Sequence, residues 1–198
     1  NNNSGTVKIG AKSVGLATTD GDIINNGDII STGEETTYIY SKNGDAVNNG
    51  ILTLSDYSVG MYGQTGTMTN NGTIENTGIR GMVAENRSTA VNKGIIGNNG
   101  SYGMWVSQGA GENNGTIQNN GSYGMFGEEN GGVSNYGFIQ NGGAYGMQAQ
   151  TGATAINHSG EIFDNIGNQG MNVTAPGSTL TTATKHGLIQ NTGDSGMS

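Results

Sequence analysis

The chain has 198 residues and a net charge of −8, with 38 glycines, 27 asparagines, 22 threonines, one proline and no cysteine. Gly and Asn are poor helix formers, so the composition excludes a helical bundle, and the lack of cysteine excludes a disulfide scaffold. No apolar run approaches the roughly 18 residues of a membrane-spanning helix, and the acidic balance argues against a nucleic-acid partner.

A repeat of about 22 residues organises the sequence, and its spacing is typical of solenoids. Low hydrophobicity alone would suit a disordered chain, but such regular spacing argues against disorder. The repeat is marked by a recurring glycine, found at Gly5, Gly27, Gly50, Gly72, Gly94, Gly115, Gly137, Gly160 and Gly187.

The first predicted strand of each unit has the form Gly-Thr-Ile-x. An aliphatic residue always stands two places after the glycine, which predicts a buried column on a short strand. This column consists of Val7, Ile29, Leu52, Ile74, Ile96, Ile117, Ile139, Ile162 and Ile189.

The second predicted strand has the form Gly-Met-x, ten to twelve residues after the repeat glycine. Its apolar column is Leu16, Ile39, Met61, Met82, Met104, Met125, Met147, Met171 and Met197. Glycine precedes this column in every unit but one, where Tyr38 stands instead. We expect that glycine to allow a bend at a corner of the coil and the flexible Met side chains to fill uneven gaps between coils.

A third, weaker strand is predicted just before the repeat turn, for example over residues 89–91 and 154–156. An asparagine follows it in seven units, at Asn3, Asn25, Asn48, Asn70, Asn92, Asn113 and Asn135. We expect these asparagines to adopt a left-handed backbone conformation and their amides to form a hydrogen-bonded ladder.

These elements predict an all-β fold, a right-handed parallel β-helix of about nine coils with a roughly triangular section. One coil buries too few side chains to offset its own ordering, so stability must come from stacking neighbouring coils. Residues 1–198 form a single segment in this interpretation. The last interval, between Gly160 and Gly187, is 27 residues long, which predicts a protruding loop over 172–186 around Pro176.

The residue after each inward Met should point outward, because side chains alternate along a strand. This outer row carries aromatic residues in four of five consecutive units. With two glutamines of the first strand, the predicted ligand-binding residues are Tyr40, Tyr62, Trp105, Phe126, Gln118 and Gln140. Such a stripe suits a sugar face or an apolar patch of a protein partner. The alternative is that the aromatics only stabilise the sheet, and Tyr102, Tyr123 and Tyr145 are expected to pack at a corner.

Catalysis and metal binding have weak support, so we expect no enzyme activity and no cofactor. The acidic residues are scattered through turn-like segments, such as Glu128-Glu129, whereas hydrolysis of polysaccharides needs converging carboxylates. His158 and His186 occupy equivalent turn positions without a third ligand, and Asp20-Gly21-Asp22 lacks the nonapeptide calcium repeat. The Asn-x-Ser/Thr triplets are part of the repeat itself, so we attribute them to the fold.

The units at 70–82 and 113–125 read Asn-Asn-Gly-Thr-Ile-x-Asn-x-Gly-x-x-Gly-Met. They resemble the passenger domains of type V autotransporters, and the Gly-Met variant is similar to the large outer-membrane adhesins of fusobacteria. The resemblance covers the whole chain and matches least over 166–185. It implies an extracellular β-helix on the bacterial surface, with a signal peptide and a C-terminal membrane barrel outside this fragment. The absence of cysteine is consistent with secretion in an unfolded state.

The preferred hypothesis is therefore a stiff spacer segment of a surface adhesin that contacts a host or bacterial surface protein or glycan. One alternative is a fragment of a β-helical polysaccharide-active enzyme. Another is an extracellular filament protein that self-associates through its terminal coils. No membrane insertion is expected of this segment.

Overall fold

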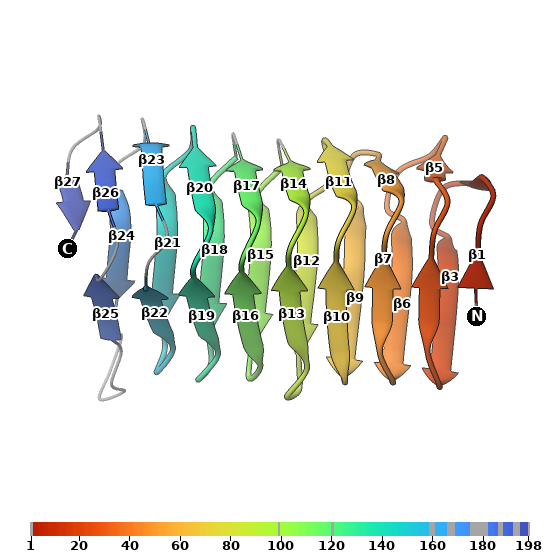
Figure 1. Cartoon of the computed structure of the whole chain (residues 1–198), viewed down its shortest axis with the longest axis horizontal. Helices are drawn as coiled ribbons and strands as arrows, with labels where there is room; N and C mark the ends of the chain where they lie inside the picture. The colour runs from red at the N-terminus through yellow and green to blue at the C-terminus, as the bar shows by residue number, and fades with distance from the viewer. Residues whose placement is uncertain are drawn as a thin grey trace.

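The computed structural model is an elongated stack of parallel strands, with β1 at one end and β26 near the other (Figure 1). It describes residues 2–98, 100–119, 121–158, 161–165, 169–174, 182–185, 188–191 and 195–197. The strands form three nine-stranded parallel sheets, and each coil contributes one strand to every sheet. The predicted parallel β-helix class is confirmed; the almost unbroken part, 2–158, makes about seven coils.

Sheet A holds the strand that precedes the repeat turn in each coil. Its strands are β1 (Asn2–Asn3), β4 (Ile23–Asn25), β7 (Ala46–Asn48), β10 (Thr67–Asn70), β13 (Thr89–Asn92), β16 (Ala110–Asn113), β19 (Gly132–Asn135), β22 (Thr154–Asn157) and β25 (Thr182–Lys185). The predicted weaker strands at 89–91 and 154–156 are therefore confirmed.

Sheet B holds the Gly-Thr-Ile strands. Its strands are β2 (Val7–Ile9), β5 (Ile29–Ser31), β8 (Ile51–Leu54), β11 (Thr73–Asn76), β14 (Ile95–Asn98), β17 (Thr116–Asn119), β20 (Phe138–Asn141), β23 (Glu161–Asn165) and β26 (Leu188–Asn191). Seven of its aliphatic column residues, from Ile29 to Ile162, have no solvent exposure.

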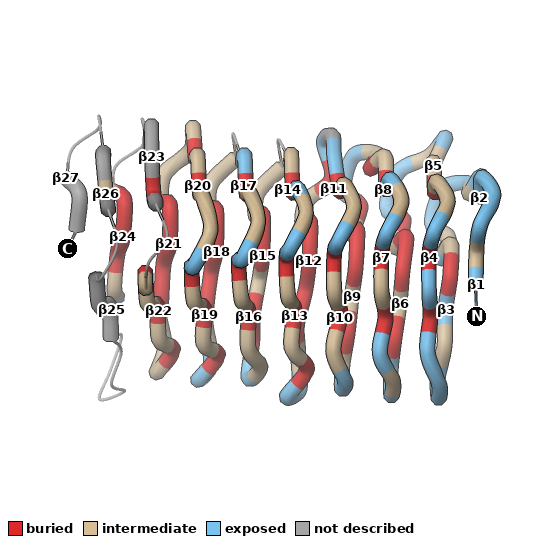
Figure 2. Tube along the Cα trace, viewed as in Figure 1, coloured by how far each residue is buried: buried red, intermediate tan, exposed pale blue. Residues whose placement is uncertain are grey.

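Sheet C holds the Gly-Met strands. Its strands are β3 (Val14–Asp20), β6 (Thr37–Asn43), β9 (Val59–Thr65), β12 (Arg80–Glu85), β15 (Tyr102–Ser107), β18 (Tyr123–Glu128), β21 (Tyr145–Gln150), β24 (Gln169–Thr174) and β27 (Ser195–Met197). Figure 2 shows buried positions recurring from coil to coil between β4 and β24. The methionines from Met61 to Met171 belong to one continuous apolar core with the sheet B column, as predicted.

The glycine before the methionine is needed because the coils approach closely there. A Cβ atom on Gly103 would lie 2.5 Å from the Gly124 carbonyl oxygen and 2.6 Å from Cγ2 of Ile117. Tyr38, which replaces this glycine in one coil, is fully buried. Its hydroxyl donates to the Thr53 carbonyl at 2.6 Å and accepts from the Ser55 N–H at 3.0 Å, so its polar end is satisfied inside the core.

The asparagine ladder is present and extends one coil further than predicted. From Asn3 to Asn157, each side-chain amide donates to the amide oxygen of the next coil at 2.7–2.9 Å. Asn157 was missed because it stands three residues before Gly160, whereas the other ladder members stand two before. The prediction of left-handed backbone was wrong, because none of these asparagines is among the positive-φ residues. The side-chain amides, not a special φ, select Asn here.

The predicted loop at 172–186 lies partly in strands. β24 reaches Thr174 and β25 begins at Thr182, whereas residues 175–181 and 186 lie outside the described residues.

Candidate functional site

The predicted outer row lies on the face of sheet C that does not contact the core. It runs in register from Tyr40 to Tyr62, Val83, Trp105 and Phe126, one residue per coil. The row is not uniformly exposed, and it is joined by a second row three residues earlier in each coil. We call this second set the corner row; it contains Arg80, Tyr102, Tyr123 and Tyr145.

Phe126 is buried rather than open to a ligand. Its side chain is only 4% exposed, because its ring packs against Tyr102 and Tyr123 of the corner row, with centroids 5.4 and 5.0 Å away. Val83, between Tyr62 and Trp105, is fully buried as well. The expectation of an exposed aromatic stripe is therefore wrong at Phe126, where the corner tyrosines close over the row.

The corner tyrosines form a stacked ladder of their own. Tyr102 and Tyr123 lie 5.0 Å apart with rings inclined by 9°, and Tyr123 and Tyr145 lie 5.5 Å apart at 16°. Burial, together with the neighbouring phenols, raises the pKa of Tyr123. The predicted corner packing is confirmed, and Tyr102 and Tyr123 cover Phe126 on the outer face of sheet C.

Tyr40, Tyr62 and Trp105 remain half-exposed members of the outer row. Tyr40 and Tyr62 stack at 5.5 Å, and the Tyr62 hydroxyl donates to the Glu85 carboxylate. Burial, and then this hydrogen bond, raise the pKa of Tyr62 to about 12. The predicted partners Gln118 and Gln140 lie on sheet B, where the Gln118 amide donates to Gln140 at 3.4 Å. The structure therefore places the glutamines and the aromatics on different sheets.

A groove of about 370 Å³ borders Trp105 at the turn from sheet C to sheet A. Three carboxylates line it, from Glu85, Glu128 and Glu129. Glu85 and Glu128 lie at the same position of the coil, two strands and about 10 Å apart, because both pair with Ser107 in the strand register, on either side of it. Sequence reasoning described the acidic residues as scattered because it did not align turn residues of different coils.

Each groove carboxylate accepts a hydrogen bond from the protein. In addition to the Tyr62 bond to Glu85, Gln150 donates to Glu128 at 3.1 Å and Ser107 donates to Glu129 at 2.8 Å. These bonds fix the carboxylates in place. The groove is thus an acidic, polar surface with one aromatic wall.

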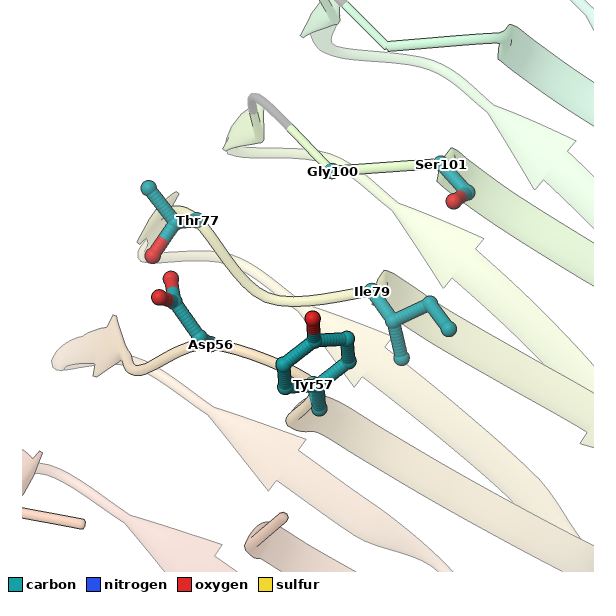
Figure 3. Close-up of a pocket in the computed structure, with 6 residues that line it drawn as sticks. All are labelled: Asp56, Tyr57, Thr77, Ile79, Gly100 and Ser101. Atoms are coloured by element: carbon teal, nitrogen blue, oxygen red, sulfur yellow. The ribbon is translucent and has the colours of Figure 1, made fainter. Parts of the chain in front are cut away.

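A second hollow, of about 260 Å³, lies at the turn from sheet B to sheet C. Its lining residues come from three consecutive coils: Asp56, Tyr57, Thr77, Ile79, Gly100 and Ser101. Figure 3 shows the Asp56 and Thr77 side chains directed toward one another, with the Tyr57 ring beside Ile79. We call this hollow the step pocket. Sequence reasoning did not single out any of its residues.

No other site emerges from the described residues. No group of three or more His, Asp or Glu side chains that could hold a metal ion is found among them. His158 stacks on Tyr136 with centroids 4.3 Å apart, and His186 lies outside the described part of the chain. No helix that could span a membrane is present in the described residues.

Comparisons with protein-family models, curated proteins and solved structures find no match for this chain.

Proposed function

We propose that this chain is a structural and binding segment of an adhesin on the bacterial cell surface. It acts outside the cell as a stiff spacer, and its sides contact a protein or glycan of a host or bacterial surface. The observation that carries this proposal is the stacking of three parallel sheets, in which β23 and β26 form the strand pair with a register shift. The resemblance of the repeat to autotransporter passengers supports the same assignment.

Stacking of this kind suits a spacer, because each coil contacts only its neighbours and length grows with coil number. The buried Asn ladder makes each coil dependent on the next, since both partners of each amide bond lie in the interior. At about 4.8 Å per coil, nine coils span roughly 40 Å.

Binding along the sides is supported by the two hollows, which border one half-exposed and one exposed aromatic side chain. Trp and Tyr are enriched among residues that dominate binding energy at interfaces. Trp105 borders the groove on the outer face of sheet C, and Tyr57, 67% exposed, borders the step pocket.

Adhesion of coated beads tests the proposal. Beads that carry the chain through one terminal tag should adhere to bacterial or epithelial cells more than beads carrying an inert protein. A Trp105→Ser variant should adhere less while keeping its fold. Adhesion equal to that of the inert protein on every cell type tested would contradict the binding role.

The groove at Trp105 also bears on the alternative of a polysaccharide-active enzyme, because three carboxylates line it. Glycosidases use two carboxyl groups, one of which must act as an acid. All three groove carboxylates here accept hydrogen bonds from side-chain donors of the protein, which hold them in place instead of leaving them free toward a substrate. We therefore expect no release of reducing ends from polysaccharides. Activity abolished by Glu128→Gln would establish the enzyme instead.

A further inference from the structure

The step pocket exists because the turn between sheets B and C changes length along the rod. Four residues, 55–58, separate β8 from β9, whereas three residues, 77–79, separate β11 from β12. The later turn between β20 (ending at Asn141) and β21 (starting at Tyr145), which is fully described, keeps the shorter length of three residues. The corner therefore steps inward after the third coil, and the hollow lies on that step.

Tyr57 lies in the four-residue turn of the third coil, directly before the turn length falls to three residues. It has a left-handed φ of 57°, as do Lys12 (55°) and Glu35 (58°) in the two preceding coils. Such a conformation is an outlier for a bulky residue and costs energy that the surroundings must supply. The corresponding turn of the fourth coil is one residue shorter, and the Tyr57 ring is 67% exposed.

Hydrogen bonds within the turn and to the preceding coil hold the turn that carries Tyr57 in place. The Asp56 carbonyl accepts from the Glu35 N–H at 3.1 Å, and the Ser58 N–H donates to Ser55 at 3.3 Å. The Ser58 hydroxyl, buried, contacts the hydroxyls of Ser55 and Thr36 at 2.9 Å each. A strained aromatic residue on a braced turn is a preorganised contact surface, which lowers the entropic cost of binding.

The polar groups around the ring are not used by the fold. Among the described residues, the Asp56 carboxylate and the hydroxyls of Tyr57, Thr77 and Ser101 make no hydrogen bond or ion pair with one another or with other side chains. An apolar wall of Tyr57 and Ile79 beside convergent acceptors and donors is the usual composition of a small-ligand site.

We infer that the step pocket binds one ring of a neutral saccharide, with the C–H face of the sugar on Tyr57 and its hydroxyls bonded to Asp56 and Thr77. A sugar ring matches the site because it has an apolar face and a polar rim. A volume of about 260 Å³ is below the roughly 300–1,000 Å³ of drug-sized pockets, which suits a single ring.

The negative charge of the pocket further restricts the class of saccharide that can bind. Asp56 is the one charged residue among those lining the pocket, and the chain carries a net charge of −8. An acidic sugar such as N-acetylneuraminic acid would therefore be repelled, whereas neutral hexoses and N-acetylhexosamines would not. The inference names a ligand class for the adhesin, so its biological role rests on the proposed function.

Saturation-transfer NMR on the whole chain tests the inference with methyl glycosides of glucose, galactose and N-acetylglucosamine as probes. We expect transfer to the ring C–H protons of at least one glycoside, with a dissociation constant on the order of 1 mM, and none to N-acetylneuraminic acid. Tyr57→Asn should weaken binding at least tenfold without unfolding the chain, because Asn tolerates the left-handed conformation. Asp56→Asn should weaken it less.

Tyr136→Ala is the matched control, because Tyr136 is also an exposed tyrosine, 44% accessible, at a different corner. It should leave the glycoside signals unchanged. The inference fails if no neutral glycoside binds, or if Tyr57→Asn binds as the natural chain does. It also fails if lysine amide, and no glycoside, gives a Tyr57-dependent signal, since the site would then take a cation.

Bead adhesion of the same variant separates this inference from the proposed function. Adhesion that persists in Tyr57→Asn, with glycoside binding absent from the natural chain, overturns the saccharide site and leaves the adhesin intact. Glycoside binding by the natural chain without adhesion to any cell overturns the adhesin role and leaves the saccharide site intact.

Discussion

The guanidinium carbon of Arg80 lies 4.8 Å from the ring centroid of Trp105 and 5.6 Å from that of Tyr102. Arg80 thereby links the corner row to the outer row on sheet C. Its Nε atom is buried without a hydrogen-bond partner, so the cation–π contacts are what hold it among the described residues. The outer face of sheet C is thus a second packed layer, open only in part.

Trp105 and Phe126 occupy the same position of the repeat, but this packing predicts that their replacement by Ser has different effects on stability. Trp105→Ser removes a half-exposed ring and one of the two cation–π contacts of Arg80, so it should lower adhesion and cost only about 1 kcal/mol of stability. Phe126→Ser empties a buried site between two tyrosines and should cost about 3 kcal/mol or more. Denaturant unfolding and bead adhesion, measured on both variants, test this difference. Equal stability of the two variants would contradict the covering of Phe126 by the corner tyrosines.

The asparagine ladder should be a main source of cohesion between coils. Asn92→Ala would remove the ladder bond that the Asn70 amide donates, and it would take the Asn92 amide away from the Asn113 side-chain oxygen and from the Thr116 carbonyl, inside the protein. Each buried unpaired group costs about 1–3 kcal/mol, so a loss of about 2–4 kcal/mol is expected.

Asn71→Ala is the control for that substitution. Asn71 is exposed and donates to Asn49 at 2.8 Å on the surface, so its loss should change stability by less than about 0.5 kcal/mol. Urea unfolding of the two variants gives the comparison. Similar midpoints would show that the interior ladder is not a special source of stability.

Close stacking at the sheet C corner predicts a sharp difference between two glycines. Gly103→Ala places a methyl group against the Gly124 carbonyl and should destabilise by about 1–3 kcal/mol. Gly97→Ala meets its nearest heavy atom at 4.0 Å and should be nearly neutral. Thermal unfolding of both variants measures the difference, and a tolerated Gly103→Ala would mean that the coils are spaced more widely.

Tyr62 predicts a loss of stability at high pH. Its pKa is raised to about 12, so the folded state holds the phenol proton more tightly than the unfolded state, whose pKa is near 10. This contribution is complete below about pH 10 and is lost as the pH rises to about 12. Tyr62→Phe should lose less stability across that range than the natural chain, as followed by denaturant midpoints. An identical decline in both would contradict the assignment.

The inward columns could be predicted from sequence because one residue type recurs at one position in every coil. Ile117, without solvent exposure, and its exposed neighbour Gln118 illustrate how strand alternation fixes the two faces. Ile117→Asp should accordingly destabilise far more than Gln118→Asp, because it buries an unpaired charge.

The surface sites could not be predicted in the same way. The burial of Phe126 depends on how rings three residues earlier lean over it, which a register argument does not contain. The groove depends on turn residues from different coils, such as Glu85 and Glu128. The step pocket does leave a trace in the sequence: the spacing from Gly50 to Met61 is eleven residues and that from Gly72 to Met82 is ten. The left-handed Tyr57 is the structural consequence.

The central claim is that the coils form one stiff rod, and distances between paired spin labels measure it most directly. The chain has no cysteine, so a pair introduced at Asn26 and Asn114, or at Asn26 and His158, would carry the only labels. Each of these residues directly follows an asparagine of the ladder. Asn26 and Asn114 are four coils apart, and Asn26 and His158 are six coils apart, which gives backbone separations of about 19 and 29 Å. The account predicts two narrow distributions that differ by about 10 Å. Broad distributions, or equal distances for the two pairs, would contradict it.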